Sequence, residues 1–577
     1  MAHLLAHISI DQLGYRRASI RDVVQLATGL NREAALIILG IYNLSLSLAS
    51  VRTATLGTLA DRYEAQRALF RLSLSETRLT EIKAHFGDAQ LLRVPLFHRQ
   101  QLLTLIKLVA KFGRGAGGNR LQKRDDFNVL GELALLTNSL WTISSNDEDA
   151  GDRIAPDLAV SFEVENPPSI AESMMLAASV LGTHLDSIKI HDAFARRLEQ
   201  TFVFSTGLNF QELLDLTFAV WSYYSSMPVT ALIEDQRKAH FNPLNPDNII
   251  AGRHLRRILD TQAIVFGEVP GVQFGNADSV RFRYNHTPLR MKPFWKFGDD
   301  NYLCIDPAFL QEKLSSGVYW TIMNALDPED GNHFARLWGR LFERQLWMIL
   351  ESIYASDRVW RSPRYLDNGD EAFDAVLDYG SHLVVCQAKS TFVPVDAKYS
   401  GNSEVFFEGM ESRYGDEPHA VLRQVRENLV SCFGLAGRRV VEQIRGRKFR
   451  EVIPIVVYQE PILEFGLVSR RFTTRFEREL KDLLFVLDLH VRPVVFIHIS
   501  DFHLIAQYIR DGDFSLVDLL HSKLSDDPNH VLSLGEFFKE RFRKSLPPSS
   551  KRDSAVTTFW QQYSDEALGR FRAGLYK

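Results

Sequence analysis

The first 143 residues carry apolar side chains mainly at three- and four-residue spacing, the pattern of amphipathic helices. The clearest runs are 20–27, 69–86 and 102–112. Residues 34–51 contain no charged side chain, but they include Asn43 and three serines, so we expect a buried helix and not a membrane span. This part is therefore predicted to form a helical domain, 1–143.

A run of acidic and small residues, 144–152, reads as a linker to a second region. After it, the pattern alternates between helical spacing and short β-like runs, which predicts a helical/β middle domain, 153–330. Helices are expected at 170–181, 188–202, 210–224 and 309–325, a turn at 240–247, and strands at 263–266, 280–284 and 302–305.

The next stretch predicts a helix at 335–350 followed by a β-hairpin. The hairpin pairs 373–378 with 382–389 through Gly380-Ser381, a pair that suits a two-residue type II′ turn. Tyr379 would then pair with His382, and Asp374 would lie opposite Gln387. Because side chains repeat every two residues along a strand, Asp374, Gln387 and Lys389 should project together from one face.

A helix at 421–433 and strands at 452–458 and 494–499 follow the hairpin. The order helix, hairpin, helix, strand predicts a mixed sheet flanked by helices, 331–510, and the remaining 511–577 is expected to be a helical tail. The fold class is therefore a multidomain chain with a mostly α N-terminal half followed by an α/β domain.

The polar residues of the hairpin predict a cation site. Burying a carboxylate, an amide and an ammonium in an apolar strand costs free energy unless these groups bind something. Hard cations take oxygen ligands, so we expect Asp374, Gln387 and the helix residue Glu343 to bind Mg²⁺ or Mn²⁺. Such an ion activates water and neutralises a phosphodiester oxygen, and Lys389 would stabilise the charge of the transition state.

This arrangement, helix Gly-x-x-x-Glu343, strand Asp374 and then Gln387-Ala-Lys389, resembles the PD-(D/E)XK nuclease superfamily, and its Gln-x-Lys form is similar to the Mrr-type restriction endonuclease branch. The resemblance implies a restriction-endonuclease-like domain, a Mg-dependent endonuclease that hydrolyses DNA, and a role in prokaryotic restriction or antiviral defence. Glu343, Asp374, Gln387 and Lys389 would be the catalytic residues. Two positions depart from the pattern: Phe373 replaces the proline, and Gln387 replaces an acidic ligand.

Three alternatives stay open. Asp396-Ala-Lys398 also has the Asp-x-Lys form, although Pro394 would interrupt its strand. With Gln387 in place of an acid, the domain could be a catalytically degraded nuclease fold that binds nucleic acid or protein. An RNase activity is the third alternative.

The net charge of −4, from 67 basic and 71 acidic residues, means that contacts to DNA must come from local basic segments. We predict phosphate contacts by two groups after the hairpin: Arg438, Arg439, Arg445, Arg447, Lys448 and Arg450, and then Arg470, Arg471, Arg475 and Arg478. The three cysteines are far apart and fit a cytoplasmic protein. DNA is the expected partner. The sequence also allows a protein partner that binds the N-terminal half, and an oligomer.

Overall fold

The N-terminal part of the chain is helical, as predicted. The computed structural model describes residues 8–56, 60–87, 95–115, 121, 124–140, 150–166, 173–174, 177–228, 232, 235–244, 252–434, 439–483, 489–527, 532–542 and 554–572. Its first helices are α1 (Ile20–Ala27), α2 (Arg32–Leu56), α3 (Ala60–Ser73), α4 (Glu76–Phe86), α6 (Arg99–Phe112) and α7 (Asn128–Ser139).

Two of these helices test the apolar pattern. The run 69–86 is split between α3 and α4, because Ser75 ends one helix and caps the next by accepting a hydrogen bond from the Arg78 amide at 3.2 Å. In α2, the window Arg32–Ala49 is long and apolar enough to cross a membrane, but 78% of it is buried inside the protein. That burial is typical of a core helix, as predicted for 34–51.

The middle region mixes helices with a small sheet. The strands β1 (His240–Phe241), β4 (Asn301–Cys304), β3 (Phe294–Phe297) and β2 (Ala263–Val265) lie in that order, with only β2 and β3 parallel. Around them are α8 (Ala150–Glu165), the π-helix η3 (Ser179–His184), α10 (Leu185–Lys189), α11 (Ala193–Thr206), α12 (Phe210–Ser225), α14 (Arg253–Thr261), α15 (Val280–Tyr284), α16 (Thr287–Met291), α17 (Pro307–Glu312) and α18 (Ser316–Met323).

Several predictions for this region need correction. The strand predicted at 280–284 is wrong, because Ser279 caps a short helix there by accepting from the Phe282 amide at 3.2 Å. The predicted helices 188–202 and 309–325 are each interrupted; Asp192, for example, begins α11 as its cap. The turn at 240–247 includes the two-residue strand β1. Most of the predicted linker 144–152 and part of the helix 170–181 lie outside the described residues.

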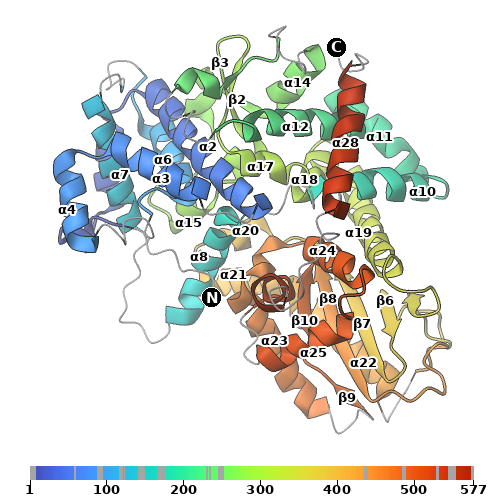
Figure 1. Cartoon of the computed structure of the whole chain (residues 1–577). Helices are drawn as coiled ribbons and strands as arrows, with labels where there is room; N and C mark the ends of the chain where they lie inside the picture. The colour runs from blue at the N-terminus through green and yellow to red at the C-terminus, as the bar shows by residue number, and fades with distance from the viewer. Residues whose placement is uncertain are drawn as a thin grey trace.

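The α/β region is a mixed sheet flanked by helices, as predicted at that level (Figure 1). The sheet order is β10 (Val495–His498), β8 (Glu451–Tyr458), β7 (His382–Lys389), β6 (Ala375–Asp378) and β5 (Val359–Arg361), and β9 (His490–Val491) also pairs with β8. The strands β5, β6 and β7 are antiparallel, whereas β7, β8 and β10 are parallel. Every residue of β8 is buried, as expected for a central strand.

Helices cover both faces of this sheet. One face packs against α19 (Pro328–Glu351) and α24 (Ile499–Arg510), and the other against α21 (Ser403–Tyr414), α22 (Val421–Phe433) and α23 (Gly466–Leu483). Alternate residues of β7 accordingly belong to two different cores: Val384 to the first and Val385 to the second.

The C-terminal residues are helical and end on the middle region. After α25 (Leu516–Asp526), α26 (Leu534–Phe537) and the π-helix η7 (Phe538–Phe542), the chain returns as α28 (Ser554–Arg572), which lies beside α12 in Figure 1. Tyr563 donates to the fully buried Asp215 at 2.6 Å, and Arg570 pairs with the same carboxylate at 2.5 Å.

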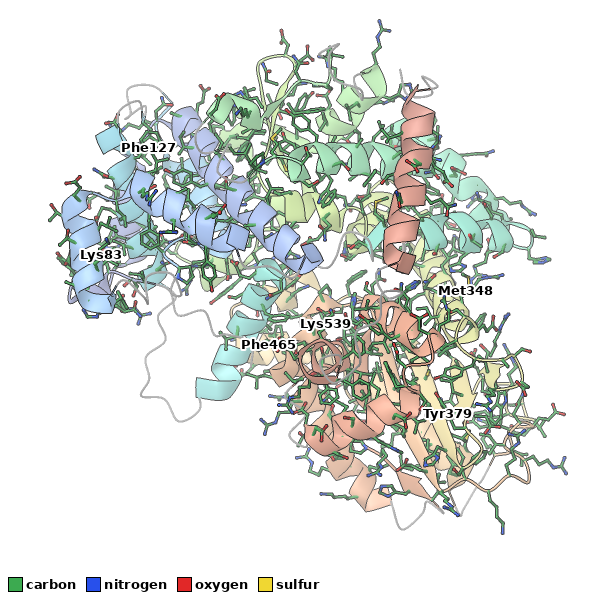
Figure 2. The ribbon with its side chains drawn as sticks, in the orientation of Figure 1. Lys83, Phe127, Met348, Tyr379, Phe465 and Lys539 are labelled. Carbon is green, nitrogen blue, oxygen red and sulfur yellow. The ribbon has the colours of Figure 1, made fainter. Side chains whose placement is uncertain are left out.

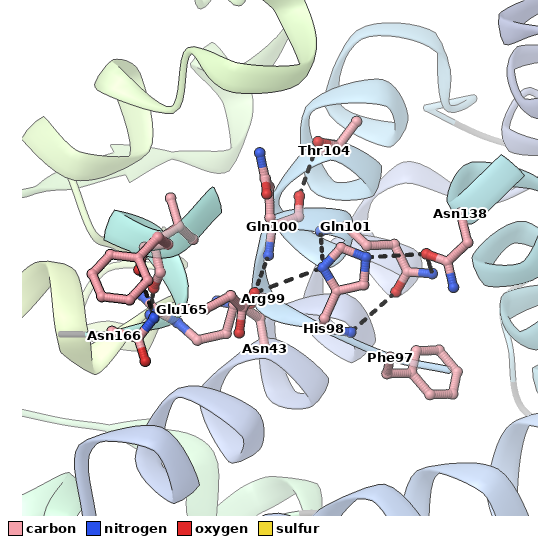
Figure 3. A network of polar contacts seen from close by, with 12 residues as sticks. Asn43, Phe97, His98, Arg99, Gln100, Gln101, Thr104, Asn138, Glu165 and Asn166 are labelled. Atoms are coloured by element: carbon pink, nitrogen blue, oxygen red, sulfur yellow. Dashed lines mark hydrogen bonds and ion pairs between the residues drawn. The ribbon is translucent and has the colours of Figure 1, made fainter. Parts of the chain in front are cut away.

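Buried polar groups connect α6 and α8 (Figure 3). His98 and Gln101 cap the start of α6 and both bond to Asn138, at 3.1 and 2.8 Å. Glu165, at the end of α8, accepts from the Gln100 amide at 3.1 Å. These contacts fix the direction of α8, which also contacts the α/β region: Phe162 on α8 packs on Phe465, labelled in Figure 2.

A buried ion network then joins α8 to the α/β region. Lys398, on the short helix α20 (Val395–Lys398), lies 2.9 Å from the Glu163 carboxylate and 2.7 Å from that of Glu460. Arg290 pairs with the other oxygen of Glu163 at 2.6 Å. The side chains of Lys398, Glu163 and Glu460 are at most 8% exposed, so water cannot replace a missing partner.

We therefore expect Lys398→Met to be strongly destabilising. It would leave two buried carboxylates without their ammonium partner, which costs about 3–5 kcal/mol in comparable sites. Thermal unfolding should show a clearly lower Tm than for Asp396→Ala, a change two residues away on the same helix at a side chain that is 83% exposed. Equal Tm values for the two variants would contradict a structural role for this network.

Candidate functional site

The turn of the β6–β7 hairpin has the predicted length of two residues. Gly380 stands at its first central position with φ +79°, a left-handed conformation that glycine adopts easily. The Tyr379 amide donates to the His382 carbonyl at 2.9 Å, which closes the turn. Asp378 supports it by accepting from the Gly380 amide at 2.7 Å.

The register that follows from this turn is also confirmed. Ala375 pairs with Cys386, so the next position places Asp374 opposite Gln387. The Gln387 side-chain amide donates to Asp374 Oδ2 at 2.7 Å, and the Ala388 backbone amide donates to the same oxygen at 2.5 Å. The hairpin thus brings together two of the predicted site residues.

Glu343 joins this pair electrostatically from α19, on the other side of the sheet. Asp374 is 7% exposed, and burial together with the nearby Glu343 carboxylate raises its pKa well above the usual range. Burial and a further carboxylate, Glu371, raise the pKa of Glu343 to about 7. Carboxylates that raise one another's pKa in this way are attractive to a cation.

Glu371 is a site residue that the sequence analysis missed. It lies three residues before Asp374, outside the Asp and Gln-x-Lys pattern, and its charge raises the pKa of both Asp374 and Glu343. Within the part of the chain that the structure describes, its buried Oε1 atom has no hydrogen-bond donor, and the same is true of Gln387 Oε1.

These oxygens are of the type that a hard cation takes, but the carboxylates of Glu343, Glu371 and Asp374 do not all lie within 4.8 Å of one another, so a shared ion requires side-chain movement. Glu343, Glu371 and Asp374 supply carboxylates, and Gln387 supplies an amide oxygen, the ligand types that Mg²⁺ and Mn²⁺ prefer. Two buried acceptors without donors are unfavourable as they stand. A cation bound to either oxygen would satisfy that acceptor.

Lys389 lies on the same side of β7 as Gln387, two residues further on. Its ammonium donates to the His419 carbonyl at 2.9 Å, and His419 itself has a left-handed backbone, φ +70°. Burial and the nearby Arg413 guanidinium lower the pKa of Lys389, while Asp374 opposes this effect. The lysine is held near the Asp374 carboxylate, and among the described residues no ion pair neutralises it.

The alternative pair Asp396 and Lys398 does not form such a site. These residues belong to the helix α20 and not to a strand, because Pro394 caps a helical turn. Residues two apart on a helix point in different directions. Lys398 is buried in the ion network described above, whereas Asp396 is exposed and pairs with Arg281.

The structure separates the two predicted basic groups. Arg450 directly precedes β8, and the first residue of β8 pairs with His382, whereas Lys389 pairs with its last residue, Tyr458. Arg450, and Arg447 through its pair with Asp378 beside the turn, therefore lie at the opposite end of the sheet from Lys389, about 23 Å away at 3.3 Å per residue. Arg439 is paired with Asp367, in the segment between β5 and Asp374, and Arg438 lies outside the described residues.

The second group lies on α23, which follows the Lys389 end of β8. Arg470 and Arg471 are exposed there, and the Arg471 guanidinium stacks over the Phe407 ring of α21 at 3.9 Å. Arg475 is instead paired with Glu411 and Glu479. Arg413, exposed on α21 and close enough to influence Lys389, adds a positive charge that the sequence analysis did not consider.

At the far end of the sheet, three residues could hold a metal ion of a different kind. His382, Glu451 and His521 place one ligand atom each within 4.8 Å of the others. The sequence analysis missed this group, because its members are 69 and 70 residues apart and come together only through the pairing of β7 with β8 and the packing of α25.

No protein-family model matches the sequence, and no curated protein or solved structure matches the chain. The function is therefore inferred from the residues of the chain and their geometry.

The raised pKa of Glu343 predicts how stability changes with pH. Its folded-state pKa of about 7 exceeds the ordinary value of 4.5, so the folded state binds more protons between these two values. The free energy of unfolding should fall as the pH rises through this interval. Glu343→Gln, measured by denaturant unfolding with chelator at pH 5 and pH 8, should show a smaller fall than the wild type.

The exposed Glu408 of α21 offers a matched control, since Glu408→Gln should keep the wild-type pH dependence. An unchanged pH dependence in Glu343→Gln would show that this carboxylate is not protonated in the folded state near neutral pH.

Proposed function

We propose that the α/β region is a metal-dependent endonuclease of the PD-(D/E)XK type that hydrolyses DNA. The observation that carries the proposal is the cluster at one end of the hairpin: Asp374 opposite Gln387, Lys389 beside them, and the carboxylates of Glu343 and Glu371 within electrostatic reach. Two buried acceptor oxygens in this cluster lack a hydrogen-bond donor.

The order of elements agrees with this proposal. A restriction-endonuclease-like core requires a mixed sheet with helices on both faces. The α/β region has such a sheet, built in the order α19, β5, β6, β7, α22 and β8, in which β5, β6 and β7 are antiparallel and β8 is parallel to β7. Of the candidate residues, Glu343 lies on α19, Gln387 and Lys389 lie on β7, and Glu371 and Asp374 lie in the segment that leads into β6. No part of the proposal depends on the helical N-terminal half.

Each residue has a distinct task in hydrolysis. Glu343, Glu371, Asp374 and Gln387 would hold Mg²⁺ or Mn²⁺, which supplies charge neutralisation and an activated water when bound. The Ala388 amide fixes the Asp374 carboxylate by its hydrogen bond. Lys389 can approach a phosphodiester oxygen with its ammonium, which stabilises the additional negative charge of the transition state as water attacks phosphorus and one P–O bond breaks.

Glu371 also compensates for the presence of Gln387 at a position where the family pattern has an acidic ligand. A neutral amide removes one negative charge from the metal site, which argues for a weaker or inactive centre. Three carboxylates remain, because Glu371 adds its charge to those of Glu343 and Asp374. The total charge therefore suits a divalent cation, and this favours an active enzyme over a degraded one.

A non-catalytic binding module is the second candidate. It is favoured by one observation: the Gln387 amide and the Lys389 ammonium are both bound to protein acceptors, Asp374 and the His419 carbonyl. For catalysis, the Gln387 amide oxygen must face the cation, and Lys389 must exchange the carbonyl for a phosphate.

Cleavage assays separate these candidates. With Mg²⁺ or Mn²⁺, the purified protein should cut DNA, and chelator should prevent it. Asp374→Ala and Lys389→Ala should each reduce the rate by about a hundredfold or more, because the first removes a charged metal ligand and the second removes the ammonium that acts on the reacting phosphate. Rates would be measured on plasmid DNA, single-stranded DNA and RNA in parallel, and cleavage of RNA alone would make the enzyme an RNase.

The exposed residues Asp396 and Lys292 provide matched controls, and their alanine variants should cut at the wild-type rate. Cleavage that persists in Lys389→Ala would place catalysis elsewhere. DNA binding without cleavage under every metal condition would support the binding module.

The position of the basic residues predicts which of them contact DNA. Arg413 and Arg470 are exposed at the Lys389 end of the sheet, whereas Arg445 and Lys448 are exposed at the opposite end. With chelator present to stop cleavage, Arg413→Gln and Arg470→Gln should each reduce the salt dependence of DNA affinity by about one unit of slope.

The pair Arg445→Gln and Lys448→Gln serves as the comparison at the far end and should leave the slope unchanged. The reverse result would show that DNA crosses the end of the sheet opposite to the candidate catalytic residues.

A further inference from the structure

A second cluster of metal-ligating residues lies at the far end of the same sheet. His382 is the first residue of β7, Glu451 is the first residue of β8 and pairs with it in register, and His521 reaches them from α25. Among the residues that the structure describes, these three form the one group of histidine, cysteine or acidic residues whose ligand atoms all lie within 4.8 Å. They are separated from the Asp374 cluster by the length of β7.

The spacing of the ligand atoms suits a tetrahedral ion. Glu451 Oε2 lies 2.6 Å from His521 Nε2 and 3.7 Å from His382 Nε2. Two ligands that each lie about 2.0–2.1 Å from a zinc ion at the tetrahedral angle are about 3.3 Å apart. The two observed distances bracket this value, so small side-chain rotations would complete three corners of the site.

The remaining polar atoms of the ligands are already held in place. Arg492 donates to Glu451 Oε1, which leaves Oε2 for the two histidines. Ser381, in the hairpin turn, bonds to His382 Nδ1 at 2.9 Å, which leaves Nε2 directed at Glu451. Such outer contacts orient the ligands of metal sites and fix the histidine tautomer.

Charge and exposure also favour an ion here. Glu451 is buried, and its carboxylate is contacted by Arg492 and by both histidines. The side chains of His382 and His521 are 32% and 36% exposed, which leaves a path for an ion and room for a water as fourth ligand.

We propose that His382, Glu451 and His521 bind a divalent ion of the zinc class, which pins α25 to the start of β7 and β8. Two imidazole nitrogens and one carboxylate select zinc and its late first-row neighbours over Mg²⁺, which prefers oxygen ligands. The site joins the C-terminal helices to the sheet, so its role is structural. It does not depend on the proposed nuclease function.

Cobalt provides a direct test, because Co²⁺ in a site of this type absorbs visible light. The full chain without an affinity tag, freed of metal by chelation, should show the strong visible absorption of one equivalent of four-coordinate Co²⁺, and Zn²⁺ but not Mg²⁺ should remove this absorption. His521→Ala and His382→Ala should weaken Co²⁺ binding by about a hundredfold or more, because a site left with two ligands holds the ion poorly. Zn²⁺ should raise the Tm of the wild type and leave that of the two variants unchanged.

Two controls make the result specific. His191 is exposed on the middle region, and His191→Ala should bind Co²⁺ as the wild type does. Asp374→Ala, which removes the central carboxylate of the other cluster, should also retain it. Circular dichroism without metal would confirm that the His521→Ala variant is folded. Failure of the wild type to bind, or full binding by folded His521→Ala, would overturn the proposal and leave the group as an ion-pair cluster around Glu451.

Discussion

The two-residue turn at Gly380 and Ser381 is the constraint on which both ends of the sheet depend. Because side chains alternate along a strand, a one-residue shift in the pairing of β6 with β7 would move Asp374 away from Gln387. Glycine permits the left-handed backbone that this turn requires, and Asp378 accepts its free amide. The turn therefore sets the register of the Asp374 cluster and, through the bond of Ser381 to His382, orients a ligand of the second cluster about 23 Å away.

The same residue types acquire opposite roles through their neighbours. Lys398 is enclosed by two carboxylates, which raise its pKa and make it part of the protein framework. Lys389 is half-buried. It faces a carbonyl oxygen and a nearby arginine, and its pKa is lowered. Sequence spacing places both lysines in a similar motif, Gln-x-Lys or Asp-x-Lys. The charges around each lysine in the folded protein distinguish a structural ammonium from one that is available to a ligand.

The sequence was sufficient where local rules determine the outcome. The turn, the hairpin register, the helices at 20–27 and 421–433 and the central strand at 451–458 all follow from glycine position and apolar periodicity. Short segments such as 280–284 were not predictable, because five residues that alternate in polarity fit a strand or a helix, and a capping serine decided the result. Glu371, His521 and Glu163 were also missed. Their partners are distant in sequence, and no spacing rule connects them before the chain has folded.

The return of α28 to the middle region has a consequence for the order in which the protein is made. Asp215 is fully buried on α12, and two of its hydrogen-bond donors, Tyr563 and Arg570, belong to the last helix. The whole α/β region lies between these residues in the chain, so it is in effect inserted into the helical body. On the ribosome, α12 emerges hundreds of residues before Tyr563 and Arg570, the side chains that donate hydrogen bonds to the Asp215 carboxylate. The helical body can therefore reach its final packing only after α28 has been synthesised, while the sheet, whose strands lie within 359–498, can form earlier.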